Sequence, residues 1–163
     1  GSEMCIRDSP SENSFNQAIL DTALVSLQRS GINPTLIRLG KEELRADTAL
    51  RKPSALMLIY PTWWGGYPAS LMQCVNEIHQ SQSDLLQDVR SILSITTHGS
   101  SKFINLLQWE WGSWYTKNRI AKICDNSVQL KWTSLYKIDR CTNEELNNYL
   151  TKVKSDVTEF LAI

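Results

Sequence analysis

The chain has 163 residues and carries 17 basic and 17 acidic side chains, so its formal net charge at pH 7 is zero. This length suits one domain with a full core and is too short for two ordinary domains. A neutral chain argues against nucleic acid or an anionic membrane as the main partner, since both need a basic surface. No apolar run approaches the roughly 20 residues that cross a bilayer, and no charged and then apolar leader opens the chain. We therefore expect a cytoplasmic protein without an integral membrane segment.

The first nine residues differ in character from the rest of the chain. Gly1 and Ser2 look like a tag scar, and Met4 to Ser9 resemble translated adapter sequence. We therefore expect residues 1–9 to be a non-native leader and the natural amino terminus to be missing. The alternative is that these residues are native and form a short strand. The four cysteines are widely spaced without a Cys-x-x-Cys pair, so we expect reduced thiols and no metal site.

A helix is predicted to begin at Ser14, because Ser14-Phe15-Asn16-Gln17 fits a capping box and apolar residues then recur at helical spacing. Gly31 follows as a stop signal. A short strand is expected over Thr35 to Leu39. The run from Ala55 to Tyr60 is nearly all apolar, as expected of a strand covered on both faces.

The second half of the chain continues this alternation. Pro68 can occupy the first turn of a helix, and Ser91 to Thr97 reads as another buried strand. The remaining predicted elements are a helix over Trp114 to Cys124, an alternating strand over Val128 to Ile138, and a terminal helix opened by a capping box at Thr142. Alternating strands and helices predict an α/β fold, with a parallel sheet, right-handed crossovers and helices on both faces.

Three polar or aromatic stretches fall at the start of a helix or at the ends of strands. They are Pro10 to Asn16, Pro61 to Tyr67 and Thr96 to Ser100. In parallel sheets ligands bind outside the carboxyl ends of the strands, so these stretches are expected on one rim. A helix amino terminus favours a phosphate, the tryptophan pair forms a flat apolar wall, and the last stretch offers polar donors. Together they suit a flavin nucleotide, although singly each also fits a simpler role as helix cap, core or interface.

At these positions the sequence resembles the flavodoxin-like NAD(P)H dehydrogenase (quinone) family. The resemblance rests on Ser9-Pro10, Ser14-Phe15-Asn16, Tyr60 to Pro68, Thr96 to Gly99 and the tail at Leu135 to Arg140, and it spans about residues 9 to 161. It implies a flavodoxin-like three-layer sandwich with a parallel sheet, in which the first strand is missing or replaced by residues 4–8. Residues 1–163 would form a single domain of this kind, an N-terminally truncated member of the family.

The family resemblance also implies a reaction and its residues. A bound flavin, FAD or FMN, would take hydride from NAD(P)H and pass two electrons to a quinone or similar acceptor. The implied flavin-binding residues are Ser14, Phe15 and Asn16 at the phosphate, Pro61, Thr62, Trp63, Trp64 and Gly65 along the ring system, and Thr97 and Gly99 at its polar edge. His98 would act as the catalytic residue by supplying a proton, with an ordinary surface-loop histidine as the alternative. Tyr67 is expected to line the acceptor pocket.

Two other functions and one assembly state stay open at this stage. A flavodoxin-type electron carrier is disfavoured because such carriers tend to be acidic for docking, and a non-catalytic truncated fragment is the third reading. The aromatic excess at Trp109, Trp111, Trp114 and Tyr115 predicts a homodimer, since exposed patches of this kind often mark partner surfaces.

Overall fold

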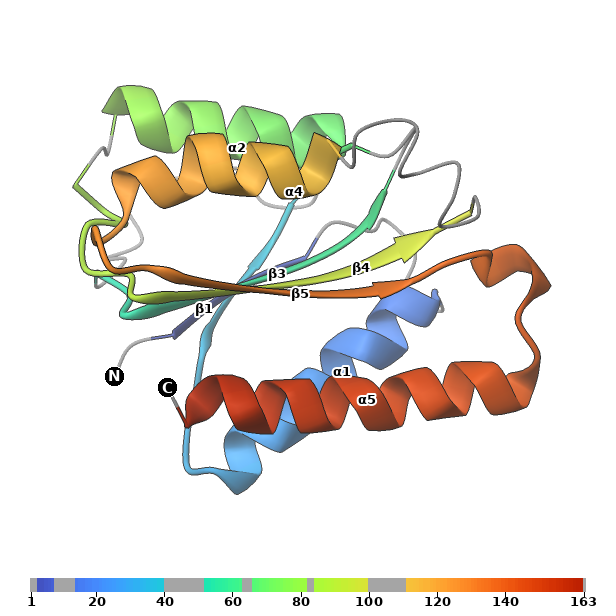
Figure 1. Cartoon of the computed structure of the whole chain (residues 1–163). Helices are drawn as coiled ribbons and strands as arrows, with labels where there is room; N and C mark the ends of the chain where they lie inside the picture. Colours follow the sequence, from blue (N-terminus) through green and yellow to red (C-terminus); the bar gives the residue numbers. More distant parts are fainter. Residues whose placement is uncertain are drawn as a thin grey trace.

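The computed structural model describes residues 3–7, 14–39, 52–62, 66–81, 84–99 and 111–162, with the backbone alone for residues 3–7 and 111. Five parallel strands form one sheet in the order β2-β1-β3-β4-β5 (Figure 1). The chain order reverses between β1 and β3, as in other doubly wound sheets with this strand order. The predicted α/β class and parallel sheet are confirmed.

The centre of the sheet is filled by β1, Glu3–Arg7. It pairs with β2, Thr35–Arg38, through Met4 opposite Thr35, and with β3, Ala55–Thr62, through Glu3 opposite Ala55. Of the two expected arrangements, a missing first strand or one supplied by residues 4–8, the structure shows the second, displaced by one residue. The backbone groups of both neighbouring strands are thereby paired.

Among the strands whose side chains are described, β4 is the most buried. Every residue of β4, Ser91–His98, is buried, and it lies between β3 and β5, Gln129–Leu135. A strand covered on both faces is expected to be apolar, yet β4 ends in Thr96, Thr97 and His98. Their polar groups therefore need partners inside the protein, and these partners define the site described below.

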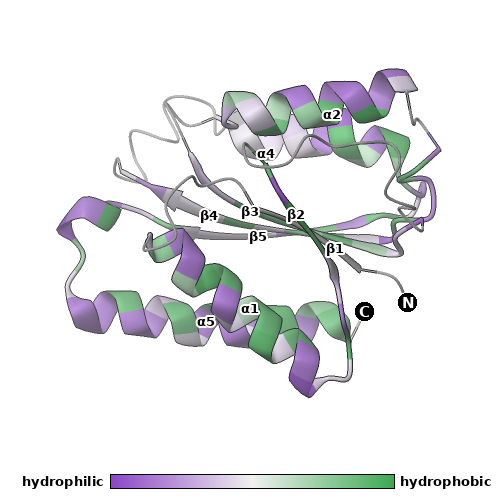
Figure 2. Ribbon diagram, turned by 180° about the vertical axis from the view of Figure 1, so that it is seen from behind, coloured by the Kyte–Doolittle hydropathy of each residue, from purple (hydrophilic) through white to green (hydrophobic). Residues whose placement is uncertain are grey.

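Helices cover both faces of the sheet. On one face lie α1, Phe15–Arg29, and α5, Asn143–Leu161. On the other lie α2, Ala69–Ser81, and α4, Trp111–Tyr115, which continues through a π-helical turn, Thr116–Ile120, and a 3₁₀ turn, Ala121–Ile123 (Figure 1). Apolar residues of the helices face the sheet and polar residues face outward (Figure 2), as expected for amphipathic surface helices.

The two helical layers bury separate halves of the core. Between the sheet and α1 and α5 the buried residues include Ile19, Leu20, Leu27, Met57, Ile59, Leu93, Ile95, Val153, Val157 and Phe160. Between the sheet and α2 they include Leu56, Leu58, Tyr60, Leu71, Val75, Ile78 and Ile92. Alternate residues of β3 thus serve opposite halves of the core, as the period of a strand requires.

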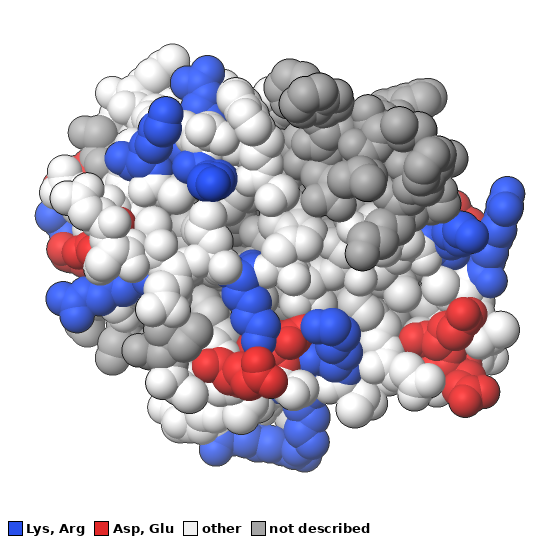
Figure 3. All heavy atoms as spheres, in the orientation of Figure 1, with Lys and Arg blue, Asp and Glu red and all other residues white. Residues whose placement is uncertain are grey.

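The two helix starts predicted from capping boxes, at Ser14 and Thr142, are present. Ser14 caps α1 by accepting a hydrogen bond from the Gln17 amide, and Thr142 and Glu145 form a complete capping box at the start of α5. No helix among the described residues is long and apolar enough to span a membrane. Acidic and basic side chains lie interspersed on the face drawn in Figure 3, in keeping with the zero net charge.

Candidate functional site

The carboxyl ends of β3 and β4 lie side by side at one rim of the sheet. Pro61 stands opposite Thr97, and Thr62 opposite His98, at the end of the ladder between the two strands. The Thr62 hydroxyl also donates to the Thr97 carbonyl at 3.1 Å. Two of the stretches predicted from the sequence to share a rim therefore do so.

The start of α1 joins the same rim. Asn16, in the first turn of this helix, is only 7% exposed, and its side-chain carbonyl accepts a hydrogen bond of 3.3 Å from the Thr97 hydroxyl. This bond orients the Asn16 amide and leaves its Nδ2 donors without a partner among the described residues. Ser14 is the N-cap of the same helix, and the first backbone N–H groups of a helix have no partner within it. The rim therefore presents hydrogen-bond donors with part of their capacity unused.

His98 is a buried polar residue of the rim. It is 3% exposed, its Nδ1 lies 2.7 Å from the Thr62 hydroxyl, and its Nε2 lies 3.0 Å from the Thr96 hydroxyl. The imidazole is stacked on the ring of Tyr136, with centroids 4.5 Å apart and planes 20° apart. The alternative that His98 is a surface-loop histidine is wrong, because β4 runs one residue further than the sequence indicated. Its role as proton donor stays a prediction.

Tyr149 of α5 is a rim residue that sequence reasoning missed. Its phenol donates to the Thr96 carbonyl at 3.0 Å and is shared with the Thr133 carbonyl at 3.3 Å. Burial raises the pKa of this phenol, and the nearby Asp156 and Tyr136 add to the rise, so the group stays a neutral donor. Its ring also contacts Phe15, with centroids 6.3 Å apart. Tyr149 thus holds the end of β4 from the face opposite His98.

Gly99 follows β4 and is crowded by the segment after β5. A Cβ atom added at Gly99 would lie 3.2 Å from the Asp139 carboxylate, which is closer than most real contacts of this kind. The segment begins with Tyr136 and Lys137, and Lys137 has a φ of 56°. A left-handed conformation is uncommon for a residue with a side chain, and here it turns the segment back toward Gly99. The predicted polar edge at Thr97 and Gly99 is therefore bounded by residues 136–140.

Tyr67 lies inside a cluster of aromatic rings and not on an open surface. It is 7% exposed, with ring centroids 4.8 Å from both Tyr60 and Tyr115. Its hydroxyl is hydrogen bonded to Thr116, which itself donates to the Gly112 carbonyl at 2.9 Å. Burial raises the pKa of the Tyr67 phenol well above its ordinary value. Lining of an acceptor pocket by Tyr67 stays a prediction, and its polar group is already used within the protein.

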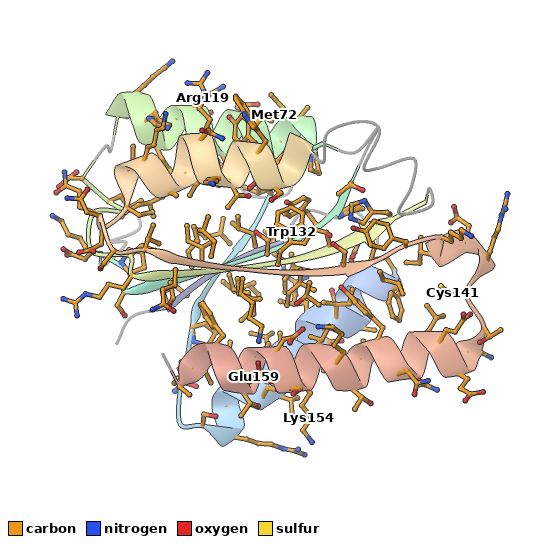
Figure 4. The ribbon with its side chains drawn as sticks, in the orientation of Figure 1. Met72, Arg119, Trp132, Cys141, Lys154 and Glu159 are labelled. Atoms are coloured by element: carbon orange, nitrogen blue, oxygen red, sulfur yellow. The ribbon has the colours of Figure 1, made fainter. Side chains whose placement is uncertain are left out.

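The remaining predicted site residues lie at the end of β3 or in the segments around it. Pro61 and Thr62 are half-buried at the end of β3, whereas Trp63, Trp64 and Gly65 lie outside the described residues. Trp132 lies in the layer between the sheet and α4 (Figure 4), with its ring centroid 6.3 Å from that of Tyr60. Within the aromatic stretch expected to mark a partner surface, Trp114 is 50% exposed while Tyr115 packs against Tyr67. Trp109 and the side chain of Trp111 lie outside the described residues.

The sequence and the structure were compared with those of known proteins. No family model matches the chain, and no curated protein matches its sequence. Among solved structures, Smu.1420 from Streptococcus mutans UA159 is 22% identical, with a TM-score of 0.75 over 98% of this chain and 100% of that chain. An NAD(P)H:quinone oxidoreductase from Methanothermobacter marburgensis is 14% identical, with a TM-score of 0.76 over 97% and 96%.

An FMN-dependent NADH-azoreductase from Bacillus anthracis, solved in complex with FMN, is 10% identical. It matches with a TM-score of 0.75 over 98% of this chain and 99% of that chain. At such sequence identities the likeness establishes the fold, and the strand order agrees with it. The chain therefore has the flavodoxin-like α/β fold.

Proposed function

We propose that the protein is an FMN-dependent oxidoreductase that takes hydride from NADH or NADPH and passes two electrons to a quinone or similar acceptor. The observation that carries the proposal is the meeting of α1, β3 and β4 at one rim through the Asn16–Thr97 bond and the Thr62–His98 pair. In sheets of this strand order the ligand site lies at the carboxyl ends of the strands beside the reversal between β1 and β3.

The described residues fit a flavin mononucleotide. The first turn of α1 offers backbone N–H groups and the positive end of a 15-residue helix, which favour a phosphate. The unused Nδ2 donors of Asn16 would add hydrogen bonds to the same anion. Thr97 and Gly99 would border the polar edge of the ring system, where backbone N–H groups follow a buried strand.

Each residue of this chain would act on the flavin by binding and orientation. Asn16 and Ser14 would fix the phosphate, and the ends of β3 and β4 would fix the ring system. When bound, the flavin supplies the two-electron chemistry between a nicotinamide and the acceptor. Tyr149 and His98 would keep the end of β4 rigid from its two faces, so that the bound ring keeps one position relative to both substrates.

We also propose that the enzyme is cytoplasmic and works as a homodimer in which Trp114 lies at or near the subunit contact. An aromatic side chain that is 50% exposed is of the type enriched at such contacts. Sedimentation analysis of the wild type and of Trp114→Ala at micromolar concentration tests this. A wild type that sediments as a monomer contradicts the dimer.

Flavin titration followed by anaerobic reduction tests the proposed activity. Purified protein should quench FMN fluorescence and bind FMN more tightly than FAD. The complex should bleach on addition of NADH or NADPH and regain its colour with a soluble quinone such as menadione. Failure to bind either flavin would remove the proposal. Binding without reduction by nicotinamide, or reduction without repeated turnover, would favour an electron carrier instead.

A further inference from the structure

His98 lies at the centre of a chain of hydrogen bonds that crosses three strands. Beyond its contacts with Thr62 and Thr96, the Thr96 hydroxyl lies 2.9 Å from the Ser134 hydroxyl. The Trp132 indole N–H donates to that same Ser134 oxygen, and on the other side Thr62 donates to the Thr97 carbonyl at 3.1 Å. This chain of hydrogen bonds thus starts at the Trp132 indole N–H, which can only donate, and ends at the Thr97 carbonyl, which can only accept.

The carbonyl end fixes the direction of the bond at His98 Nδ1. The Thr62 hydrogen is directed to a carbonyl, so the Thr62 oxygen accepts from His98 Nδ1. On the other side, the ring is neutral when Thr96 donates to His98 Nε2, and Thr96 then accepts from Ser134, which also receives the indole N–H. Each hydroxyl then donates once and accepts once. This arrangement corresponds to a neutral imidazole with its hydrogen on Nδ1.

The protonated ring does not fit this arrangement. An imidazolium would donate at both nitrogens, which reverses the bond between Thr96 and Ser134 and leaves the Ser134 hydrogen without its acceptor in the chain. It would also place a positive charge on a residue that is 3% exposed. A proton released from Nδ1 to a substrate would break the bond to Thr62. The geometry therefore favours a fixed ring over a proton donor.

We propose that His98 is a positioning residue, whose neutral, Nδ1-protonated ring ties the end of β3 to the end of β4. Thr62 is the last residue of β3 and His98 the last of β4, so this link sets the spacing of the two segments that follow them. Stacking on Tyr136 holds the ring plane and connects the segment after β5 to the same unit. The proposal rests on the proposed function, because the flavin ring system would lie against these strand ends.

The tautomer can be measured without any ligand. Long-range ¹⁵N–¹H spectra of ¹⁵N-labelled protein distinguish the Nδ1–H form, the Nε2–H form and the imidazolium. The chain has two histidines, and His79→Gln assigns the signals by removing the other one. We expect His98 in the Nδ1–H form at pH 7 in the full-length protein. An Nε2–H ring or an imidazolium at pH 7 would overturn the proposal even if the protein binds flavin.

Variants separate positioning from proton donation. His98→Ala and Thr62→Val should each accelerate amide exchange at the ends of β3 and β4 and leave α2 unchanged. Each should weaken FMN binding about tenfold, the usual effect of one lost buried hydrogen bond. The double variant should be no weaker than the worse single variant, because both remove the same link. Thr62→Val keeps the side-chain volume and serves if His98→Ala does not fold.

Kinetic measurements on the two half-reactions would give a different result if His98 were a proton donor. A donor variant would slow only the acceptor half-reaction and change its pH profile, with FMN affinity unchanged, and that result would overturn positioning. A wild type that binds no flavin would remove the proposed function, while the tautomer and the amide exchange would still test the link. Normal exchange at both strand ends in Thr62→Val would overturn the link in that case.

Discussion

The Thr97 hydroxyl donates to the side-chain carbonyl of Asn16, so the end of β4 is joined to the start of α1. Both residues are buried, with 3% and 7% of their surface exposed. The bond turns the amide of Asn16 so that its N–H groups are available at the rim. A helix start and a strand end that are remote in sequence therefore act as one unit.

Asn16→Ala is expected to weaken FMN binding about tenfold, because it removes donors to the phosphate and leaves Thr97 without its acceptor. Asn16→Asp should weaken binding further, since a carboxylate has no N–H and repels a phosphate. Fluorescence titration of FMN measures both. Asn148→Ala, at an exposed position of α5, is the matched control and should bind as the wild type does. Equal affinity of Asn16→Asp and wild type would place the phosphate elsewhere.

Asp156 of α5 is buried and should contribute strongly to stability at neutral pH. The Thr133 hydroxyl donates to it at 2.6 Å, Lys131 Nζ lies 3.2 Å away, and Lys152 also pairs with it. Asp156→Ala would leave the buried Thr133 hydroxyl without its acceptor and remove a partner of both lysines, and it should lower the free energy of unfolding by about 2 to 3 kcal/mol. Urea denaturation at pH 7 measures this. Glu159→Gln, an exposed partner of the same Lys131, should destabilise the protein far less than Asp156→Ala does.

The contribution of Asp156 should disappear in acid. Burial raises the pKa of its carboxyl, but hydrogen bonds from Lys152, Thr133 and Lys131 outweigh burial, and the net pKa is lowered from 3.8. A group with a lowered pKa stabilises the fold above its unfolded value and loses that contribution as pH falls through the folded value. The difference between wild type and Asp156→Asn should therefore shrink below about pH 4. A difference that stays constant from pH 7 to pH 3 would contradict this account.

Thr142→Ala should destabilise the protein by about 1 kcal/mol, because it removes one half of the capping box of α5. The Thr142 hydroxyl accepts from the Glu145 amide at 3.2 Å, and the Glu145 carboxylate accepts from the Thr142 amide at 2.7 Å. Thr142→Ser keeps the hydroxyl and should retain most of the stability. Thermal melting compares the three proteins. Equal loss in the serine and alanine variants would mean that the methyl group, and not the cap, matters.

Cys74 should resist alkylation in the folded protein. Burial, with a smaller contribution from the charge of Glu77, raises the pKa of the Cys74 thiol to about 12. At pH 8 only about one thiol in ten thousand would then be the reactive thiolate. Iodoacetamide labelling followed by peptide mass spectrometry should find Cys74 unmodified in buffer and fully modified in guanidinium chloride. Labelling of Cys74 at the same rate in both solvents would show that α2 opens readily.

The strands and helices of the fold can be predicted from the sequence, whereas the hydrogen-bond partners of the buried polar side chains cannot. Apolar residues dominate Ala55 to Tyr60 and Ser91 to Thr97, which predicts buried strands, and both segments belong to the sheet. His98 was harder, because its burial depends on hydroxyls from β3 and β5 that no local pattern reveals. A polar strand end has the same appearance as a loop when only its neighbours in sequence are considered.

The inward face of α5 shows the same difficulty. Helical spacing of the apolar residues predicts an inward face that includes Leu146, Leu150 and Leu161 beside the buried Val153 and Val157, yet the three leucines are only partly buried. The buried face instead includes Tyr149 and Asp156, whose polar atoms are satisfied by β4 and β5. Apolar periodicity cannot identify a buried carboxylate, because the partners that make its burial tolerable come from another element.

The parallel sheet also has a consequence for how the chain acquires its site. Its pairings join distant segments, such as Glu3 with Ala55 and Ala55 with Ser91, and such contacts form slowly because long loops must close first. The rim needs α1, β3 and β4 in their final order, whereas each helix can begin to coil locally. During refolding, helical circular dichroism should therefore recover before the ability to capture FMN, and cofactor uptake would mark the last stage of assembly.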